Sequence, residues 1–186
     1  MKRAVSVLVV AVTYAVAAPL IAEARLKDAG DVDISFLAKG PAGMKIPGTA
    51  EQGGAKEEDG KIKLWAQVSS MGKTGIGLRD KHMRGYLTAK DCDDKGKVVL
   101  RVDRSKVKFP DNDKTVEGSA TGELTLNCVT KPQQFKYKAK RTGSDFHVQA
   151  LFDVDIYEHD VKPCYLGVCV DKDVKVNAKM KLRDGK

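Results

Sequence analysis

Hydrophobic and polar residues alternate with a period of two along most of this chain. Alternation of this kind places apolar side chains on one face of a β-strand and polar side chains on the other. Turn residues separate most of the runs, which favours short connections and an up-and-down antiparallel order. The pattern predicts eight strands, at Val32–Phe36, Met44–Glu51, Ile62–Val68, Val98–Val102, Val116–Leu126, Phe135–Ala139, Phe146–Val154 and Val174–Leu182.

Two segments between these runs lack the alternation. Gln52 to Gly60 is polar and rich in glycine, and is interpreted as a turn before the third strand. Leu78, Met83 and Leu87 lie near helical spacing, which predicts a short helix between the third and fourth strands. No internal repeat and no second domain is evident, so the sequence predicts an all-β domain with one helical segment.

Eight antiparallel strands with one apolar face can stack as a sandwich or close as a barrel, and a closed barrel can hold one small ligand. Small residues lie in the middle of several strands, which favours a hollow interior; a tightly coiled, filled core is the alternative. On the hollow interpretation, the ligand-binding residues are the inward-facing ones: Ile34, Phe36, Leu64, Ala66, Leu100, Val102, Gly118, Ala120, Gly122, Leu124, Phe135, Tyr137, Ala139, Val148, Ala150, Phe152, Val176, Ala178 and Met180.

Residues 1–24 have the features of an export signal. Lys2 and Arg3 precede an uncharged, mostly apolar stretch, and a small-x-small sequence ending at Ala24 predicts cleavage before Arg25. A membrane anchor is the alternative, but the apolar stretch of about 17 residues is short for spanning. The mature domain is therefore expected to comprise residues 25–186, to lack a stable membrane span, and to be periplasmic or secreted.

Composition and charge narrow the class of protein. The 186 residues are 42% hydrophobic, enough for the core of one ordinary domain, and the net charge is +8. Many lysines alternate with apolar or small residues, as in Lys61/Lys63 and Lys179/Lys181, so they are expected on the wet face of strands. No interleaved aromatics or nucleic-acid motif accompany them, so no nucleic-acid partner is expected. Attraction to anionic lipid surfaces is the functional alternative.

Two motifs resemble those of the YceI-like family. Thr74-Gly75 followed by Leu78–Arg84 resembles the family pattern T-G…R-D-x-H-[LM]-R, and Gly122–Pro132 resembles its G-x-L-T-[LI]-x-G-V-T-K-P hairpin. Tyr165–Val168 followed by Val174 resembles the loop and closing strand. The resemblance runs in order from about Asp31 to Leu182.

The resemblance implies a fold and a function. It implies an extended eight-stranded antiparallel lipocalin-like barrel enclosing an apolar pocket for polyisoprenoids or other amphiphilic lipid chains, without catalytic residues. The chain departs from the family pattern in three places. Cys128 stands where the hairpin motif carries glycine, Asp91–Lys95 replaces a segment with a tyrosine-proline pair, and the first strand lacks a histidine.

The four cysteines indicate disulfide bonds, because an exported chain enters an oxidising compartment. A hairpin that turns near Asp111 would bring Cys92 and Cys128 together at its open end, and Cys164 and Cys169 bracket a short loop. Of the three possible connectivities we favour Cys92–Cys128 with Cys164–Cys169. Free thiols and a four-cysteine zinc site are the alternatives, although no C-x-x-C pair is present.

No catalytic motif, cofactor site or metal site is found in the sequence. Arg79, His82 and Arg84 are candidates to meet an anionic head group at a polar mouth, while a structural role in fixing the helix is the alternative for Arg79 and Asp80. An enzyme acting on an isoprenoid diphosphate would need clustered acids and a metal, and the only dense acidic group is Asp91, Asp93 and Asp94.

The sequence thus favours an exported, non-enzymatic carrier or sequestering protein for a polyisoprenoid or similar lipid chain. The principal alternative is a structural or stress-protective envelope protein with a filled barrel that binds no lipid.

Overall fold

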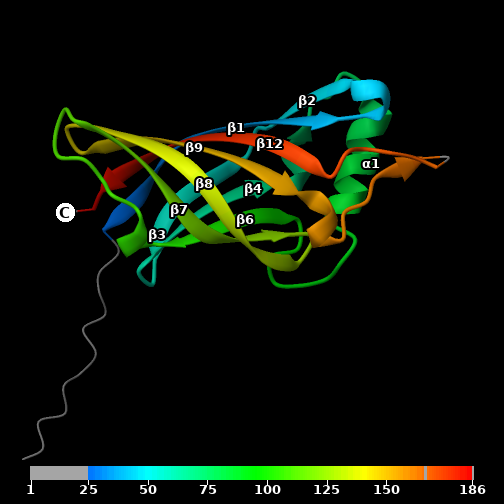
Figure 1. Ribbon diagram of the computed structural model, residues 1–186. Helices are drawn as coiled ribbons and strands as arrows, with labels where there is room; N and C mark the ends of the chain where they lie inside the picture. Colours follow the sequence, from blue (N-terminus) through cyan, green and yellow to red (C-terminus); the bar gives the residue numbers. More distant parts are fainter. Residues whose placement is uncertain (1–24, 166, 186) are drawn as a thin grey trace, which may run out of the picture.

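A computed structural model describes residues 25–165 and 167–185 (Figure 1). Over these residues the fold is one curled antiparallel sheet of ten strands, with the order β3-β4-β6-β7-β8-β9-β12-β1-β2-β5, and a separate β10–β11 hairpin. The strands are β1 (Leu26–Lys39), β2 (Lys45–Ala50), β3 (Gly53–Glu58), β4 (Lys61–Gln67), β5 (Met71–Gly72), β6 (Lys97–Asp103), β7 (Thr115–Leu126), β8 (Val129–Thr142), β9 (Asp145–Asp155), β10 (Cys164–Tyr165), β11 (Val168–Cys169) and β12 (Asp173–Asp184).

The helical elements are short. A single α-helix, α1 (Gly77–Leu87), is joined in the described residues by four 3-10 turns: η1 (Pro41–Gly43), η2 (Val68–Ser70), η3 (Arg104–Lys106) and η4 (Ile156–His159). In Figure 1, α1 and the β10–β11 hairpin lie at the right-hand end of the elongated molecule, and the turn between β8 and β9 lies at the opposite end.

The sheet curls until its first strand in the order, β3, lies beside β1. The two strands contact each other without pairing as a ladder. A side-chain carbon built at Gly53 of β3 would lie 3.3 Å from Cγ1 of Val32 in β1, which shows how closely the strands approach. The architecture is therefore an all-β, curled half-barrel with one short helix.

The eight alternating runs all form strands, and the helical spacing at Leu78–Leu87 is confirmed by α1. The strand count was wrong, because β3 and the two-residue β5 also join the sheet. Of the polar segment expected to be a turn, only Asp59-Gly60 forms one; Gly53–Glu58 pairs with β4 as β3. In chain order α1 consequently follows the fifth strand rather than the third.

The export signal at residues 1–24 lies outside the described residues, so its cleavage stays a prediction. Among the helices that the structure describes, none is both long enough and apolar enough to cross a membrane.

The half of the sheet far from α1 is filled by aromatic side chains. The rings of Phe109 and Phe146 meet edge to face with centroids 5.1 Å apart. Phe135 and Tyr137 are buried on the inner face of β8, and the Tyr137 hydroxyl accepts a hydrogen bond of 2.9 Å from the Lys108 backbone N–H. Ala139, beside them, is 0% exposed.

The mid-strand small residues do not hollow out this half. A side-chain carbon built at Gly118 would lie 2.8 Å from the Tyr137 hydroxyl oxygen, and one built at Gly122 would lie 2.5 Å from the Arg101 carbonyl oxygen. Glycine and alanine here make room for cross-strand aromatic rings and for close strand approach. Gly118 and Gly122 therefore do not surround empty space, and Ala139 nearby is fully buried.

Candidate functional site

A cavity of about 1400 Å³ occupies the other half of the molecule, at the end that carries α1. Its wall combines the inner face of the curled sheet with α1, the β10–β11 hairpin and the turn after β1. A filled barrel, the alternative raised by the sequence, would have no space of this size.

Two rows of paired residues build the sheet part of the wall. Leu64 pairs with Leu100, which pairs with Leu124, so one row crosses β4, β6 and β7. Phe36 pairs with Val176, which pairs with Phe152, so the second row crosses β1, β12 and β9. Of the sequence-predicted ligand-binding residues, those that line the cavity are Ile34, Phe36, Leu64, Ala66, Leu100, Leu124, Phe152, Val176 and Ala178.

The other predicted residues do not line this cavity. Val148 and Met180 border a separate hollow of about 550 Å³, together with Lys138, Lys140 and His147. The remainder are absent from both walls: Val102, Gly118, Ala120, Gly122, Phe135, Tyr137, Ala139 and Ala150. The alternation of apolar and polar residues indicates which side chains face the interior. It does not indicate which part of each strand lies beside the cavity.

Helix α1 contributes lining residues that strand alternation could not identify. Met83, Tyr86 and Leu87 face the cavity and pack against the core. The near-helical spacing of Leu78, Met83 and Leu87 was the available signal, because it marks one face of a helix. Tyr86 also donates a hydrogen bond of 3.2 Å from its hydroxyl to the Cys164 carbonyl, which connects α1 to the β10–β11 hairpin.

An acidic side chain anchors the start of α1. Asp80 accepts hydrogen bonds from the Thr74 hydroxyl, from the Thr74 N–H at 3.2 Å and from the Lys73 N–H at 3.0 Å. The Thr74 hydroxyl bond is the main reason that the pKa of Asp80 lies below its ordinary value. Arg84 donates to the Met71 carbonyl at 2.8 Å. Asp80 and Arg84 thus fasten α1 to the chain that leads into it.

The three head-group candidates have different surroundings. Arg79 and His82 line the cavity, and Arg79 also donates a hydrogen bond of 3.2 Å to the Thr74 carbonyl. Arg84 is absent from the lining and is directed to Met71. Lys81, which is not among the three head-group candidates, also lines the cavity. The charged side chains of the lining, Arg79 and Lys81, are both cationic.

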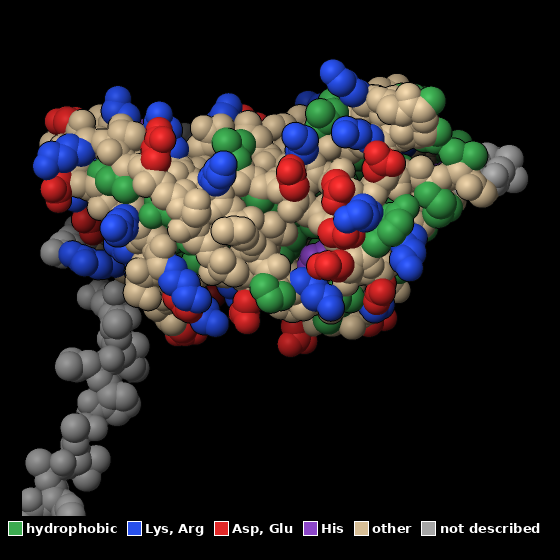
Figure 2. Space-filling view, in the orientation of Figure 1, with side chains coloured by type: hydrophobic (Ala, Val, Ile, Leu, Met, Phe, Trp, Pro, Cys, Tyr) green, Lys and Arg blue, Asp and Glu red, His purple; other side chains and the backbone are tan. Residues whose placement is uncertain are grey.

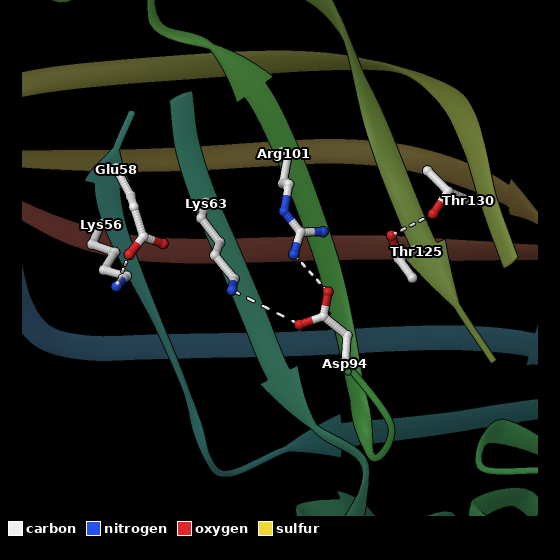
Figure 3. Close-up of polar contacts among 7 residues, drawn as sticks. All are labelled: Lys56, Glu58, Lys63, Asp94, Arg101, Thr125 and Thr130. Carbon is white, nitrogen blue, oxygen red and sulfur yellow. Dashed lines mark hydrogen bonds and ion pairs between the residues drawn. The ribbon is translucent and has the colours of Figure 1, made fainter. Parts of the chain in front are cut away.

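The acidic segment after α1 lies on the outer surface instead. Asp94 is held by Arg101 and, at 3.8 Å, by Lys63, as Figure 3 shows. The hydrogen bond from Arg101 is the main cause of the lowered pKa of Asp94. Asp91 pairs with Lys95. In the part of the chain that the structure describes, no three His, Cys, Asp or Glu side chains gather as metal ligands.

Both expected disulfide bonds are present. Cys92–Cys128 joins the loop after α1 to the turn between β7 and β8, and Cys164–Cys169 closes the β10–β11 hairpin at the cavity. Asn127 and Cys128 have φ angles of +48° and +62°, so this two-residue turn uses the left-handed backbone that glycine adopts most readily. Cys128 therefore occupies a position that favours glycine, and there it forms a cross-link.

The sequence matches the model of one protein family, and the fold matches solved structures. A family model described as the YceI-like domain matches residues 33–182. No curated protein matches the sequence.

Two solved structures share the fold. One is a polyisoprenoid binding domain from Saccharophagus degradans implicated in plant cell wall breakdown, with a TM-score of 0.67 and 15% identity over 87% of this chain and 98% of that chain. The other is BcnA from Burkholderia cenocepacia, with a TM-score of 0.59 and 13% identity over 81% and 95% of the two chains.

Proposed function

The chain belongs to the YceI-like family, and from this premise we propose that it binds a polyisoprenoid or similar amphiphilic apolar chain in its cavity. The observation that carries the proposal is the cavity itself. It has a volume of about 1400 Å³, and its wall consists of aliphatic and aromatic side chains together with the cationic side chains of Arg79 and Lys81. The name of the Saccharophagus degradans domain supports the same class of ligand.

Burial of the chain supplies the affinity. An isoprenoid chain that loses roughly 400 Å² of apolar surface to the cavity gains on the order of 10 kcal/mol at about 25 cal/mol per Å². The loss of translational freedom and the ordering of the chain cost several kcal/mol of this gain, which leaves micromolar or somewhat tighter binding. Because one methylene is worth only about 0.8 kcal/mol, the cavity is expected to discriminate weakly between similar chains.

In the proposed complex Arg79 and Lys81 meet an anionic head group, and His82 lies beside them. Each comes from the first turns of α1, at the cavity wall, where charge-assisted hydrogen bonds to phosphate or carboxylate oxygens can form. Arg84 is left out of this role because it is bound to Met71. The role proposed for the site is binding without catalysis.

The proposed setting is the periplasm or the extracellular space, where the protein acts as a carrier or sequestering protein. The signal-like residues 1–24 support export. The two disulfide bonds support an oxidising compartment.

A matched pair of alanine substitutions tests ligand binding. Ala66 lines the cavity and Ala139 lies in the packed half, and both are buried. Ala66→Leu should fill space needed by the ligand and remove contacts with about two methylenes, which weakens binding of geranylgeranyl phosphate roughly tenfold. Isothermal titration of delipidated protein measures this. Failure of the unaltered protein to bind, or unchanged affinity in Ala66→Leu, contradicts the proposal.

Ala139→Leu is the control. Because Ala139 is 0% exposed and packed, the larger side chain should lower the free energy of unfolding by about 1–3 kcal/mol. Its ligand affinity, measured below its melting temperature, should remain near that of the unaltered protein.

A further inference from the structure

Exposed apolar side chains gather at the opening of the cavity. Five large hydrophobic side chains are exposed among the described residues, and four of them also line the cavity: Met44, Ile76, Leu78 and Val168, with exposed fractions of 46%, 52%, 63% and 50%. We call these four the apolar rim. Side chains that face both the cavity and the solvent mark the place where the cavity opens.

The apolar rim comes from three separate elements. Met44 follows η1, Ile76 and Leu78 flank the first residue of α1, and Val168 belongs to the β10–β11 hairpin. These elements lie together at the right-hand end of the molecule in Figure 1, and Figure 2 shows hydrophobic side chains exposed at this end. Exposed apolar residues that surround a cavity mouth in this way are typical of an interaction surface.

The same three elements carry most of the protein's net positive charge. Residues 39–45, 73–84 and 162–172 contain eight basic side chains against the two carboxylates Asp80 and Asp171, whereas the rest of the chain from residue 25 onward is nearly balanced, with 23 basic and 22 acidic residues. The eight are Lys39, Lys45, Lys73, Arg79, Lys81, Arg84, Lys162 and Lys172.

Several of these cations are available to a partner. Lys73 pairs with Glu51, and Lys172 pairs with Asp155 and Asp173. In contrast, Lys39, Lys45 and Lys81 are exposed and form no ion pair within the described residues. Asp80, the carboxylate closest to the apolar rim in sequence, is occupied by its hydrogen bonds to Lys73 and Thr74.

We propose that the apolar rim and the flanking lysines dock this protein on the surface of an anionic lipid bilayer, with the cavity opening toward the membrane. Apolar side chains beside basic ones bind such surfaces by combining burial at the head-group boundary with attraction to anionic lipids. The proposal goes beyond ligand binding, because docking requires no ligand in the cavity. It also gives an apolar chain a route between bilayer and cavity that avoids water.

Vesicle co-sedimentation tests the docking without any isoprenoid. The full mature protein should sediment with vesicles of phosphatidylcholine and phosphatidylglycerol, and much less with phosphatidylcholine alone. Ile76→Ser with Leu78→Gln should weaken this binding about tenfold, and so should Lys45→Glu with Lys81→Glu. If Ile76→Ser with Leu78→Gln fails to fold, Leu78→Gln alone replaces it, because Leu78 is highly exposed.

The controls are matched in chemistry and differ in place. Leu151→Gln removes the fifth exposed hydrophobic side chain, on β9 and outside the cavity lining. Lys136→Glu with Lys140→Glu reverses two exposed charges on β8. The hydrophobic control should leave vesicle binding within about twofold of the unaltered protein, and the β8 charge reversal should reduce it far less than Lys45→Glu with Lys81→Glu.

No sedimentation with anionic vesicles, or equal losses in rim and control variants, overturns the proposal. Because the vesicles contain no isoprenoid, that result would leave the ligand-binding proposal standing.

Discussion

His159 shows how a single buried residue connects two parts of this molecule. It lies at the end of η4 with 2% exposure, and its Nδ1 is 2.8 Å from the Val129 carbonyl oxygen. Its own carbonyl accepts a hydrogen bond of 3.3 Å from the Asn127 side chain, which in turn accepts one of 3.1 Å from the Lys90 N–H. Burial is the main cause of a pKa for His159 below its usual 6.5.

This pKa shift predicts a loss of stability in mild acid. As the pH falls below about 6.5, the unfolded chain binds a proton at this histidine before the folded protein does, so the free energy of unfolding decreases. Urea unfolding at about pH 7.5 and pH 5.5 should show a larger loss for the unaltered protein than for His159→Gln. His147→Gln, at an exposed position, is the control and should behave like the unaltered protein; an unchanged loss in His159→Gln contradicts the assignment.

At the scale of elements, α1 depends on its anchor more than on its own sequence. The helix carries Gly77 and Gly85 and buries none of its residues completely, and its eleven residues are marginal for an isolated helix. Asp80 and Arg84 instead tie it to Thr74 and Met71. The T-G…R-D-x-H-[LM]-R pattern thus has a physical role here, which is to hold a helix over the cavity.

Removal of the anchor should therefore loosen α1 selectively. Asp80→Ala deletes three hydrogen bonds to a charged acceptor, and the free energy of local opening should fall by about 1–3 kcal/mol. Hydrogen exchange followed by mass spectrometry should show roughly tenfold or faster exchange in Gly77–Leu87, with strands β8 and β9 little changed. Asp93→Ala removes an exposed carboxylate and should have no such effect.

At the scale of the whole molecule, the disulfide Cys92–Cys128 connects the loop after α1 to the turn between strands β7 and β8. It closes a loop with a sequence separation of 36, whereas Cys164–Cys169 spans a separation of 5. In the chain-entropy model these loops correspond to about 4 and about 2 kcal/mol of stabilisation. The longer cross-link is therefore expected to dominate the response to reduction.

Thermal melts of cysteine variants measure the two contributions. Cys92→Ala with Cys128→Ala should lower the melting temperature more than Cys164→Ala with Cys169→Ala. Cys92→Ala with Cys128→Gly should recover about 1 kcal/mol of the first loss, because glycine adopts the φ of +62° at residue 128 without strain. Equal melting temperatures for Cys92→Ala with Cys128→Ala and for Cys92→Ala with Cys128→Gly would show that a side chain at residue 128 does not strain the turn.

The sequence by itself indicated the eight alternating strands, the helix, the family and the disulfide pairs. These depend on local or nearly local information: period-two alternation sets the face of each strand, and hairpin pairing near Asp111 sets which cysteines meet. The observed register, in which Leu100 pairs with Leu124, agrees with a hairpin that turns near Asp111 and brings Cys92 and Cys128 together.

Only the tertiary structure decided where the interior is hollow. Alternation assigned Ala66 and Ala139 to the same inner face, but Tyr137 and Phe146 fill one end of the sheet while α1 covers space at the other. It also decided that the polar, glycine-rich Gly53–Glu58 forms a strand, because this segment pairs with β4 and its Gly53 fits closely against Val32 of β1. Depth along a strand and contact between distant strands arise from the curl of the sheet, which a period of two residues does not encode.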